Sequence, residues 1–279
     1  MSNNEMTVGN VTITALSDGI FRALARETYP EVPERVWTCG CETPESPPQL
    51  ENNIGSYLVR SKGRTIMVDT GAGPLPPDSS GSVWGLLMDD MKAQSIDVDQ
   101  IDTVFMTHLH FDHVGWNLRK ENGRYLPVFP KARYIASAID WDFFRNEPEA
   151  AERYYYRPEP VEPLESLGLM DLIDGEYHLT DELTAIHTPG HTPGHMSILI
   201  SSQGEKGIIL GDVAHNPLQV HETGWKVDAD VDHDQARMTR ESIMKRIEAE
   251  GLKMAAGHFP APGFGKVIRL EGKRYWKAL

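Results

Sequence analysis

The sequence has very little cysteine. Only Cys39 and Cys41 occur among 279 residues. Because one residue separates them, the geometry that a relaxed disulfide requires disfavours a bond between them. Two thiols are also too few for a zinc site built from cysteines. We therefore expect both cysteines to be reduced thiols in a loop.

Long apolar runs are also missing. None approaches the roughly 18 consecutive residues that a membrane-spanning helix needs. The first six residues, MSNNEM, have neither the basic region nor the apolar region of a secretory signal peptide. These features predict a cytoplasmic protein without a membrane partner.

Positive charge is scarce relative to negative charge. The chain has 27 Lys and Arg residues against 41 Asp and Glu residues, which gives a formal net charge of −14 at pH 7. Such a balance repels phosphate backbones and anionic lipid headgroups, so general binding of nucleic acid is disfavoured. A hydrophobic content of 40% with 24% charged residues is typical of a soluble globular protein rather than a disordered or fibrous one.

From residue 54 onwards, strand-like segments alternate with helix-like segments. Residues 54–61 and 65–71 are rich in β-branched and apolar residues and flank the turn dipeptide Lys62-Gly63, which predicts a hairpin. The apolar spacing predicts a helix over 83–94, followed by a strand over 102–110. A second set follows, with strands predicted over 182–190, 195–202, 206–212 and 253–258 and an amphipathic helix over 237–251 that ends at Gly251.

Two β-then-α sets of similar order predict an α/β fold with two packed sheets and helices on the outside. We expect one domain over 1–279, with halves of about 1–146 and 176–279 joined by a loop-rich segment. The first 53 residues also look loop-rich. The aromatic residues of these stretches could cover a cleft or simply pack on the surface, and the sequence leaves both open.

The segment Thr107-His108-Leu109-His110-Phe111-Asp112-His113-Val114-Gly115 carries the densest chemistry. Side chains at i and i+2 share a face of an extended chain, so His108 and His110 can point at one centre. Asp112 and His113 follow where the chain must turn. Three imidazoles and one carboxylate within six residues suit zinc or another first-row divalent ion.

Three later residues each lie at the end of a predicted strand, next to a glycine. They are His191 in TPGHTPGH, Asp212 in ILGD and His258 in AAGHF. An isolated histidine is usually a surface or core residue without a metal. That reading would have to hold for the local cluster and for all three later positions together, so the sequence favours a metal site.

These residues resemble the pattern of the metallo-β-lactamase superfamily, which is His-x-His-x-Asp-His followed by a distant His, a bridging Asp and a last His. The resemblance extends from VDTG at 68–71 through His258. It implies a four-layer αβ/βα sandwich and two divalent metal ions, with Zn²⁺ expected and Mn, Fe or Co as alternatives. The implied ligands are His108, His110 and His191 for one ion, Asp112, His113 and His258 for the other, and Asp212 as the bridge.

The implied site suits hydrolysis. Two divalent cations, two carboxylates and a bridging hydroxide leave roughly one positive charge, which favours an oxyanion that develops in the transition state. Metals about 3.5 to 4 Å apart can deliver that hydroxide and polarise the bond that it attacks. Neither a Ser nor a Cys nucleophile is then required. Asp112 is a candidate catalytic residue as well as a ligand.

The flanking segments THLHFDHVGWN, HTPGHTPGH and GDVAHNPLQ are similar to those of lactonases and methyl parathion hydrolase-like members of the superfamily. Acyl-homoserine-lactone lactonases have a Tyr three residues after the bridging Asp, whereas this chain has His215, which favours the second subgroup. A histidine there could donate a hydrogen bond to an oxyanion or protonate a leaving alkoxide. The alternative is a solvated loop histidine.

Several neighbouring residues have two interpretations. Asp69 is a candidate hydrogen-bond partner for a ligating imidazole or a turn former, and His195 is a support for the ligands or a packing residue. Phe111, Trp116 and Phe259 could line an apolar pocket or belong to the core. We interpret His187 as structural and His221 and His233 as surface residues.

The sequence therefore predicts a dinuclear metallo-hydrolase of the lactonase or esterase type, whose substrate is a small molecule with a lactone or activated carboxylic ester. Phosphotriesterase, β-lactamase and thioesterase activities are the alternatives among enzymes. A metal-binding protein without turnover is the alternative from another class. No nucleic-acid partner is expected, and a homodimer is left open.

Overall fold

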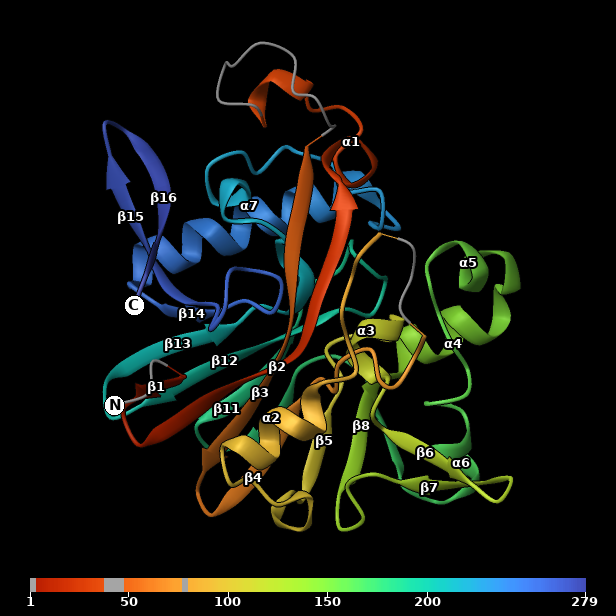
Figure 1. The fold of residues 1–279 in the computed structure, drawn as a ribbon. Coiled ribbons are helices and arrows are strands. Elements are labelled where there is room, and N and C mark those ends of the chain that lie inside the picture. The colour runs from red at the N-terminus through yellow and green to blue at the C-terminus, as the bar shows by residue number, and fades with distance from the viewer. Residues whose placement is uncertain (1–3, 38–47, 77–79) are drawn as a thin grey trace.

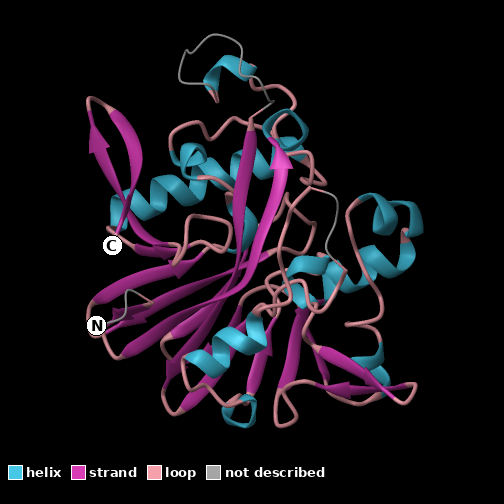
Figure 2. Cartoon of the chain, viewed as in Figure 1, coloured by secondary structure: helices cyan, strands magenta, loops and turns pink. Residues whose placement is uncertain are grey.

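The computed structural model describes residues 4–37, 48–76 and 80–279 (Figure 1). Strands fill the centre of the molecule and helices lie around it (Figure 2). The strands form two seven-stranded sheets and one two-stranded sheet. Cys39 and Cys41 lie outside the described residues, so the structure does not test the prediction that they are reduced thiols in a loop.

The first sheet comes from the first two thirds of the chain. In spatial order its strands are β1 (Glu5–Val8), β2 (Val11–Leu24), β3 (Gln49–Ser61), β4 (Arg64–Val68), β5 (Thr103–Phe105), β8 (Arg133–Ser137) and β9 (Met170–Ile173). Neighbours from β1 to β4 are antiparallel, and those from β4 to β9 are parallel. Lys62 and Gly63 have positive φ angles between β3 and β4, so the predicted hairpin is confirmed.

The second sheet comes from the last third. Its strands are β10 (Tyr177–Thr180), β11 (Leu183–His187), β12 (Met196–Ser202), β13 (Glu205–Ile209), β14 (Lys253–Ala255), β15 (Phe264–Leu270) and β16 (Lys273–Ala278). Only the β13–β14 pair is parallel, and the 18-residue helix α7 (His233–Glu250) lies in the crossover that such a pair requires. The separate hairpin is β6 (Leu118–Glu121) with β7 (Arg124–Pro127).

The other helices are short. They are α1 (Ala25–Thr28), α2 (Leu87–Ala93), α3 (Phe111–Val114), α4 (Ala138–Asn146), α5 (Pro148–Arg153), α6 (Pro163–Ser166) and the 3₁₀ turns η1 (Glu34–Val36), η2 (Val98–Gln100), η3 (Gly211–Val213) and η4 (Pro217–Val220). None of the helices in the described ranges has the length and apolar character to cross a bilayer.

Alternation along the central strands builds four layers. In β4, Ile66 packs between the two sheets, whereas Met67 faces the opposite way and packs with Leu87 of α2. In β13, Ile209 faces the first sheet and Ile208 packs beneath α7. Successive strand residues point to opposite faces, so each sheet buries both of its faces. Figure 1 shows α2 and α7 on opposite sides of the paired sheets, and the predicted αβ/βα sandwich is confirmed.

The N-terminal region differs from the prediction. The first 53 residues are not mainly loop, because β1, the 14-residue β2 and the start of β3 lie there. The β-branched run Val11-Thr12-Ile13-Thr14 is the strand signal, and the prolines that suggested loops are confined to residues 30–48. The connecting segment is also more regular than expected, since it contains α5, α6 and β9.

Two helix boundaries also differ. The helix predicted over 83–94 begins only at Leu87, because Val83 exchanges backbone hydrogen bonds with Ile20 of β2 and Gly85 has a φ of 85°. A positive φ excludes a right-handed helix at that point. In contrast, α7 begins four residues before the predicted start, where the Asp232 side chain caps it, and it ends at Gly251 in the left-handed conformation as predicted.

Candidate metal centre

The histidine-rich segment follows β5 as a bend. The strand ends at Phe105, because both the amide and the hydroxyl of Thr107 donate to the carboxylate of Asp69 at 2.8 Å. The strand predicted through residue 110 is therefore wrong, and His108 and His110 project from a bend rather than from one strand face. Their rings nevertheless lie side by side, with centroids 4.6 Å apart.

The next turn of the chain is α3, which carries Asp112 and His113. Nδ1 of His113 donates to Oδ2 of Asp69 at 2.9 Å, so Asp69 has the predicted hydrogen bond to an imidazole. This bond fixes the tautomer of His113 and leaves its Nε2 free to face the centre. The same Asp69 carboxylate thus holds the start of the bend through Thr107 and the end of it through His113.

The remaining predicted residues come from loops of the second half. His191 lies between β11 and β12, Asp212 lies in η3 after β13, and His258 follows β14. Gly190 precedes His191 with a φ of 130°, and a Cβ there would meet the backbone of Ala236 at 2.2 Å. Glycine is therefore required where the His191 loop packs against α7.

Asp212 lies at the middle of the assembled residues. The distances from its Oδ2 to Nε2 atoms are 3.0 Å for His258, 3.2 Å for His215, 3.3 Å for His191, 3.4 Å for His113 and 3.9 Å for His108. Nε2 of His191 also lies 2.9 Å from Nδ1 of His110. Oδ2 of Asp112 lies 3.6 Å from Nε2 of His258. The structure thus brings all seven predicted residues together, with His215 beside them.

Overlapping groups of donor atoms could each hold a cation. Each group has donor atoms within 4.8 Å of one another, and the groups are His108, His110 and His191; His108, His113 and Asp212; Asp112, His113 and His258; and His191, Asp212 and His215. The first and third match the two ligand trios that the resemblance implies. Asp212 belongs to two other groups, as suits a residue between two ions.

Several polar atoms of the centre are buried without a hydrogen-bond partner. Within the described part of the chain, those without a hydrogen-bond partner include Nε2 of His108, His110 and His113, both ring nitrogens of His215, and Oδ1 of Asp212. Burying such atoms unpaired is unfavourable, so a group that accepts their lone pairs is expected there. Imidazole nitrogens with carboxylate oxygens are suitable ligands for a divalent ion such as Zn²⁺.

The electrostatics separate two kinds of histidine. Burial, reinforced by neighbouring imidazoles, lowers the pKa of His108 and His110 well below 6.5. Burial also opposes the charged form of His258, but the Asp212 and Asp112 carboxylates outweigh it and raise the pKa of His258 to about 9. Burial would raise the pKa of Asp212, but the imidazoles of His258, His113 and His215 outweigh it and hold that pKa well below its usual value. Asp212 is therefore an anion in a ring of nitrogen donors.

Further buried residues hold the ligands in place. Nε2 of His195 accepts the amide hydrogen of Asp212 at 2.8 Å, so His195 supports the centre rather than merely packing. Burial lowers the pKa of His195 to about 3, which keeps that nitrogen an acceptor. Nδ1 of His258 donates to the carbonyl of Asn53 at 2.9 Å, and His187, as expected of a structural residue, bonds the carbonyl of Pro193.

Sequence reasoning missed three buried aspartates near the centre. Asp230 accepts a hydrogen bond from Nδ1 of His191 at 3.0 Å. Asp140 accepts one from the hydroxyl of Thr192, the residue after His191. Asp18 accepts from the amides of Ala72, Gly73 and Leu87 and from the Trp116 indole. Asp230 stands in the run Asp228-Ala-Asp-Val-Asp-His-Asp234, where only contacts made in the fold distinguish one carboxylate from the others.

A family model for the metallo-beta-lactamase superfamily matches residues 52–258. The chain belongs to this superfamily. Among solved structures, AidC, a dizinc quorum-quenching lactonase in complex with a product, is 22% identical over 99% of this chain and 96% of its own, with a TM-score of 0.83. AbOPH, a hydrolase in the beta lactamase superfamily, is 25% identical over the same shares, with a TM-score of 0.81. A comparison with curated proteins found no match.

A third solved structure is a probable metal-dependent hydrolase from Staphylococcus aureus. It is 19% identical over 94% of each chain, with a TM-score of 0.81. At such identities the likeness shows the fold. Superfamily membership makes the chain a metallo-hydrolase by family, and its His and Asp clusters match the two metal ions that the superfamily typically binds.

The clustered His and Asp side chains form the floor of a cavity of about 890 Å³. Its walls include the aromatic rings of Phe21, Trp84, Phe111, Tyr155 and Tyr156. Phe111 therefore lines the cavity, whereas the alternative interpretation as core residues holds for the other two aromatic candidates. Trp116 packs on the first-sheet core and bonds Asp18, and Phe259 is fully buried beside Trp276. The aromatic segment after α5 does border a cleft.

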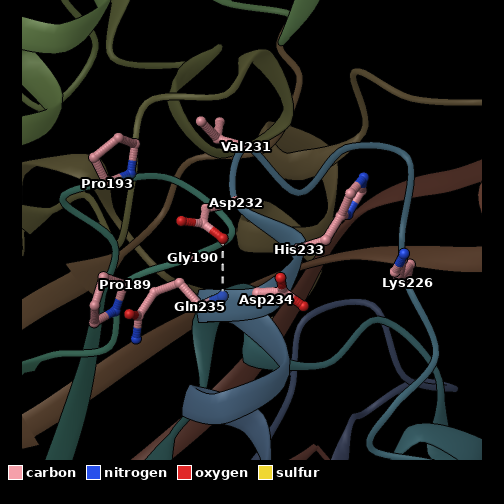
Figure 3. Close-up of a pocket in the computed structure, with 9 residues that line it drawn as sticks. All are labelled: Pro189, Gly190, Pro193, Lys226, Val231, Asp232, His233, Asp234 and Gln235. Atoms are coloured by element: carbon pink, nitrogen blue, oxygen red, sulfur yellow. Dashed lines mark hydrogen bonds between the residues drawn. The ribbon is translucent and has the colours of Figure 1, made fainter.

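A second cavity of about 680 Å³ lies at the start of α7, outside the donor cluster (Figure 3). Pro189 and Pro193 of the His191 loop form part of its wall. Asp232 already caps α7 there by accepting the amide hydrogen of Gln235 at 2.9 Å. His233, predicted to be a surface residue, is partly buried on this wall, and His221 is partly exposed and stacks on Tyr275.

Proposed function

We propose that the protein uses two divalent metal ions to hydrolyse an ester-type bond in a small molecule, namely a lactone or an activated carboxylic ester. The observation that carries this proposal is the convergence of seven His and Asp side chains, with unpartnered buried donor atoms, at the floor of a cavity with apolar walls. Zn²⁺ is the metal that we propose, with Mn, Fe or Co as alternatives, because His and Asp sites accept all of them.

We propose the following ligands: His108, His110 and His191 for one ion, Asp112, His113 and His258 for the other, and Asp212 between them. When bound, such ions lower the pKa of a shared water towards about 7 and polarise the oxygen of the bond under attack. Asp69, Asp230 and the Asn53 carbonyl each hold an imidazole by its Nδ1, which directs Nε2 of His113, His191 and His258 towards the centre.

Asp112 and His215 are the proposed catalytic residues. Asp112 keeps 16% of its side chain exposed against 3% for Asp212, so its carboxylate is open to the cavity and can accept a hydrogen bond from the attacking water. His215 is fixed through its backbone amide, which donates to Gln219 at 2.7 Å. Burial lowers the pKa of His215, and a neutral imidazole still donates one N–H to the oxygen that becomes negative.

The cavity favours uncharged substrates with an apolar group. Aromatic walls bind apolar surface, and among the described residues of the lining the carboxylates of Glu27, Glu152 and Asp228 outnumber the one arginine, Arg157. Anionic substrates are repelled by such a rim. An uncharged phosphotriester is the second candidate substrate, because His215 stands where the acyl-homoserine-lactone lactonases have Tyr.

Chelation tests this proposal. We expect the Zn²⁺-loaded protein to hydrolyse a chromogenic ester and at least one member of a lactone panel, with lower KM for longer apolar acyl groups. Removal of metal by a chelator should abolish turnover, and added Zn²⁺ should restore it. Metal content is measured on the same samples. A fully loaded protein that hydrolyses no ester, lactone, thioester, phosphotriester or β-lactam would instead support a binding protein.

A further inference from the structure

Arg240 is a buried cation at the middle of α7. Its side chain is 1% exposed, although arginine is among the residues least often found fully inside a protein. Burying a guanidinium is unfavourable unless its donors are paired. The partners of Arg240 therefore indicate what the buried charge does.

The hydrogen-bond partners of Arg240 among the described residues lie in η3, which carries Asp212, and in the segment 221–232, which includes the cavity-lining Val227, Asp228 and Ala229. Nε donates to the carbonyl of Val213 at 2.7 Å, the residue that follows Asp212. One terminal nitrogen donates to the carbonyls of Thr223 and Trp225 at 3.0 and 2.8 Å. The other donates to Oδ2 of Asp230 at 3.2 Å. The guanidinium thus joins η3, which carries Asp212, to the segment 221–232 that leads into α7.

Asp230 divides its two oxygens between Arg240 and a proposed ligand. Oδ2 accepts from Arg240, while Oδ1 accepts from Nδ1 of His191 at 3.0 Å, and the carboxylate is 0% exposed. Since each oxygen has a charged or polar partner, the carboxylate has a single favourable orientation. That orientation requires the N–H of His191 on Nδ1 and leaves its Nε2 without a proton at the centre, 3.3 Å from Oδ2 of Asp212.

We propose that Arg240 and Asp230 act as one positioning unit, which orients the His191 imidazole and places the Asp212 loop, and so sets the metal affinity of the centre. The proposal rests on the ligands named under the proposed function but is independent of the substrate. Neither residue touches the reacting atoms. Removing a partner that orients a ligating histidine typically lowers metal affinity about 10- to 100-fold.

A nearby ion-pair cluster provides a matched control. Arg274 of β16 pairs with Glu241 and Glu248 of the same helix at 3.0 and 3.1 Å, and its side chain is 14% exposed. It therefore also ties α7 to a neighbouring element through an arginine. In the described part of the chain its side chain pairs with carboxylates of α7 and with none of the loops of the centre, so its loss should affect stability without affecting the metal.

The test measures Zn²⁺ affinity by competition with a chromogenic chelator. Wild type, Asp230→Asn, Arg240→Met, the double variant and Arg274→Met are compared, after circular dichroism has shown that each metal-free protein is folded. We expect Asp230→Asn and Arg240→Met each to weaken binding about 10- to 100-fold. The Zn²⁺ affinity of the double variant should be no lower than that of the more affected single variant, because the two residues act as one unit. Arg274→Met should bind as wild type does.

The outcomes are distinguishable. Unchanged affinity in folded Asp230→Asn, or losses that multiply in the double variant, would overturn the proposal. If Arg240→Met fails to fold, Asp230→Asn decides alone, because the amide preserves the shape of the side chain. A wild type that binds Zn²⁺ but hydrolyses nothing would contradict the proposed function and leave the positioning unit intact. A wild type that binds no Zn²⁺ would overturn both.

Discussion

Replacing Asp212 with alanine should abolish hydrolysis and remove most of the bound metal. Oδ2 of Asp212 lies within 3.4 Å of four histidine Nε2 atoms, which come from both halves of the chain. Without this carboxylate, the centre loses the negative charge that balances the positive charge of bound metal ions. The loss of several kcal/mol of transition-state stabilisation corresponds to a fall in kcat/KM of more than about 1,000-fold.

The measurement combines ester turnover with metal analysis of the purified Asp212→Ala protein. Asp234→Ala is the matched control, because Asp234 is an exposed carboxylate in the first turn of α7 and belongs to none of the donor groups. The control should retain both metal and activity. If Asp212→Ala kept two metal ions per chain and wild-type turnover, the assignment of Asp212 as the bridge would be wrong.

Replacing His215 with alanine should leave the metal content intact and lower kcat by about 100- to 1,000-fold, the usual cost of removing one donor to a developing oxyanion. His215 is 9% exposed at its side chain, and its Nδ1 lacks a hydrogen-bond partner within the described residues, whereas its Nε2 faces Oδ2 of Asp212 at 3.2 Å. Its ring therefore has a donor available for substrate. Because such a contact strengthens in the transition state, the effect should fall on kcat rather than KM.

His221→Ala is the control for this variant, since His221 is partly exposed and stacks on Tyr275 away from the cavity lining. Both proteins are assayed for metal and for steady-state kinetics. An unchanged kcat in His215→Ala would make His215 a bystander. Loss of metal would instead make it a ligand, as its grouping with His191 and Asp212 allows, and would contradict the catalytic assignment.

The central strands and the clustered site residues were predictable because their signals are local. Short runs of apolar and β-branched residues mark β3, β4, β12 and β13, and each of these strands buries most of its apolar residues. The ligand candidates share a dense motif or stand beside a glycine after a strand. The structure brings them together even though His108 and His110 arrive by a bend rather than a strand.

What the sequence could not indicate depends on distant contacts. Val83 has the spacing of a helix residue, but its hydrogen bonds to Ile20, more than sixty positions earlier, pull it into an extended pairing. In the sequence Asp230 cannot be distinguished from its three neighbouring aspartates. Only the fold gives it hydrogen bonds to Arg240 and His191. Trp116 and Phe259 follow ligands in the chain, yet the fold turns their rings towards the core.

The most direct test of the dinuclear site is an anomalous difference map at the zinc edge, from crystals of the protein grown with Zn²⁺. We expect two peaks per chain. One lies among His108, His110 and His191, the other lies among Asp112, His113 and His258, and both are within reach of Asp212. A map with no peak there, or with these side chains turned away from the ions that are bound, would contradict the account.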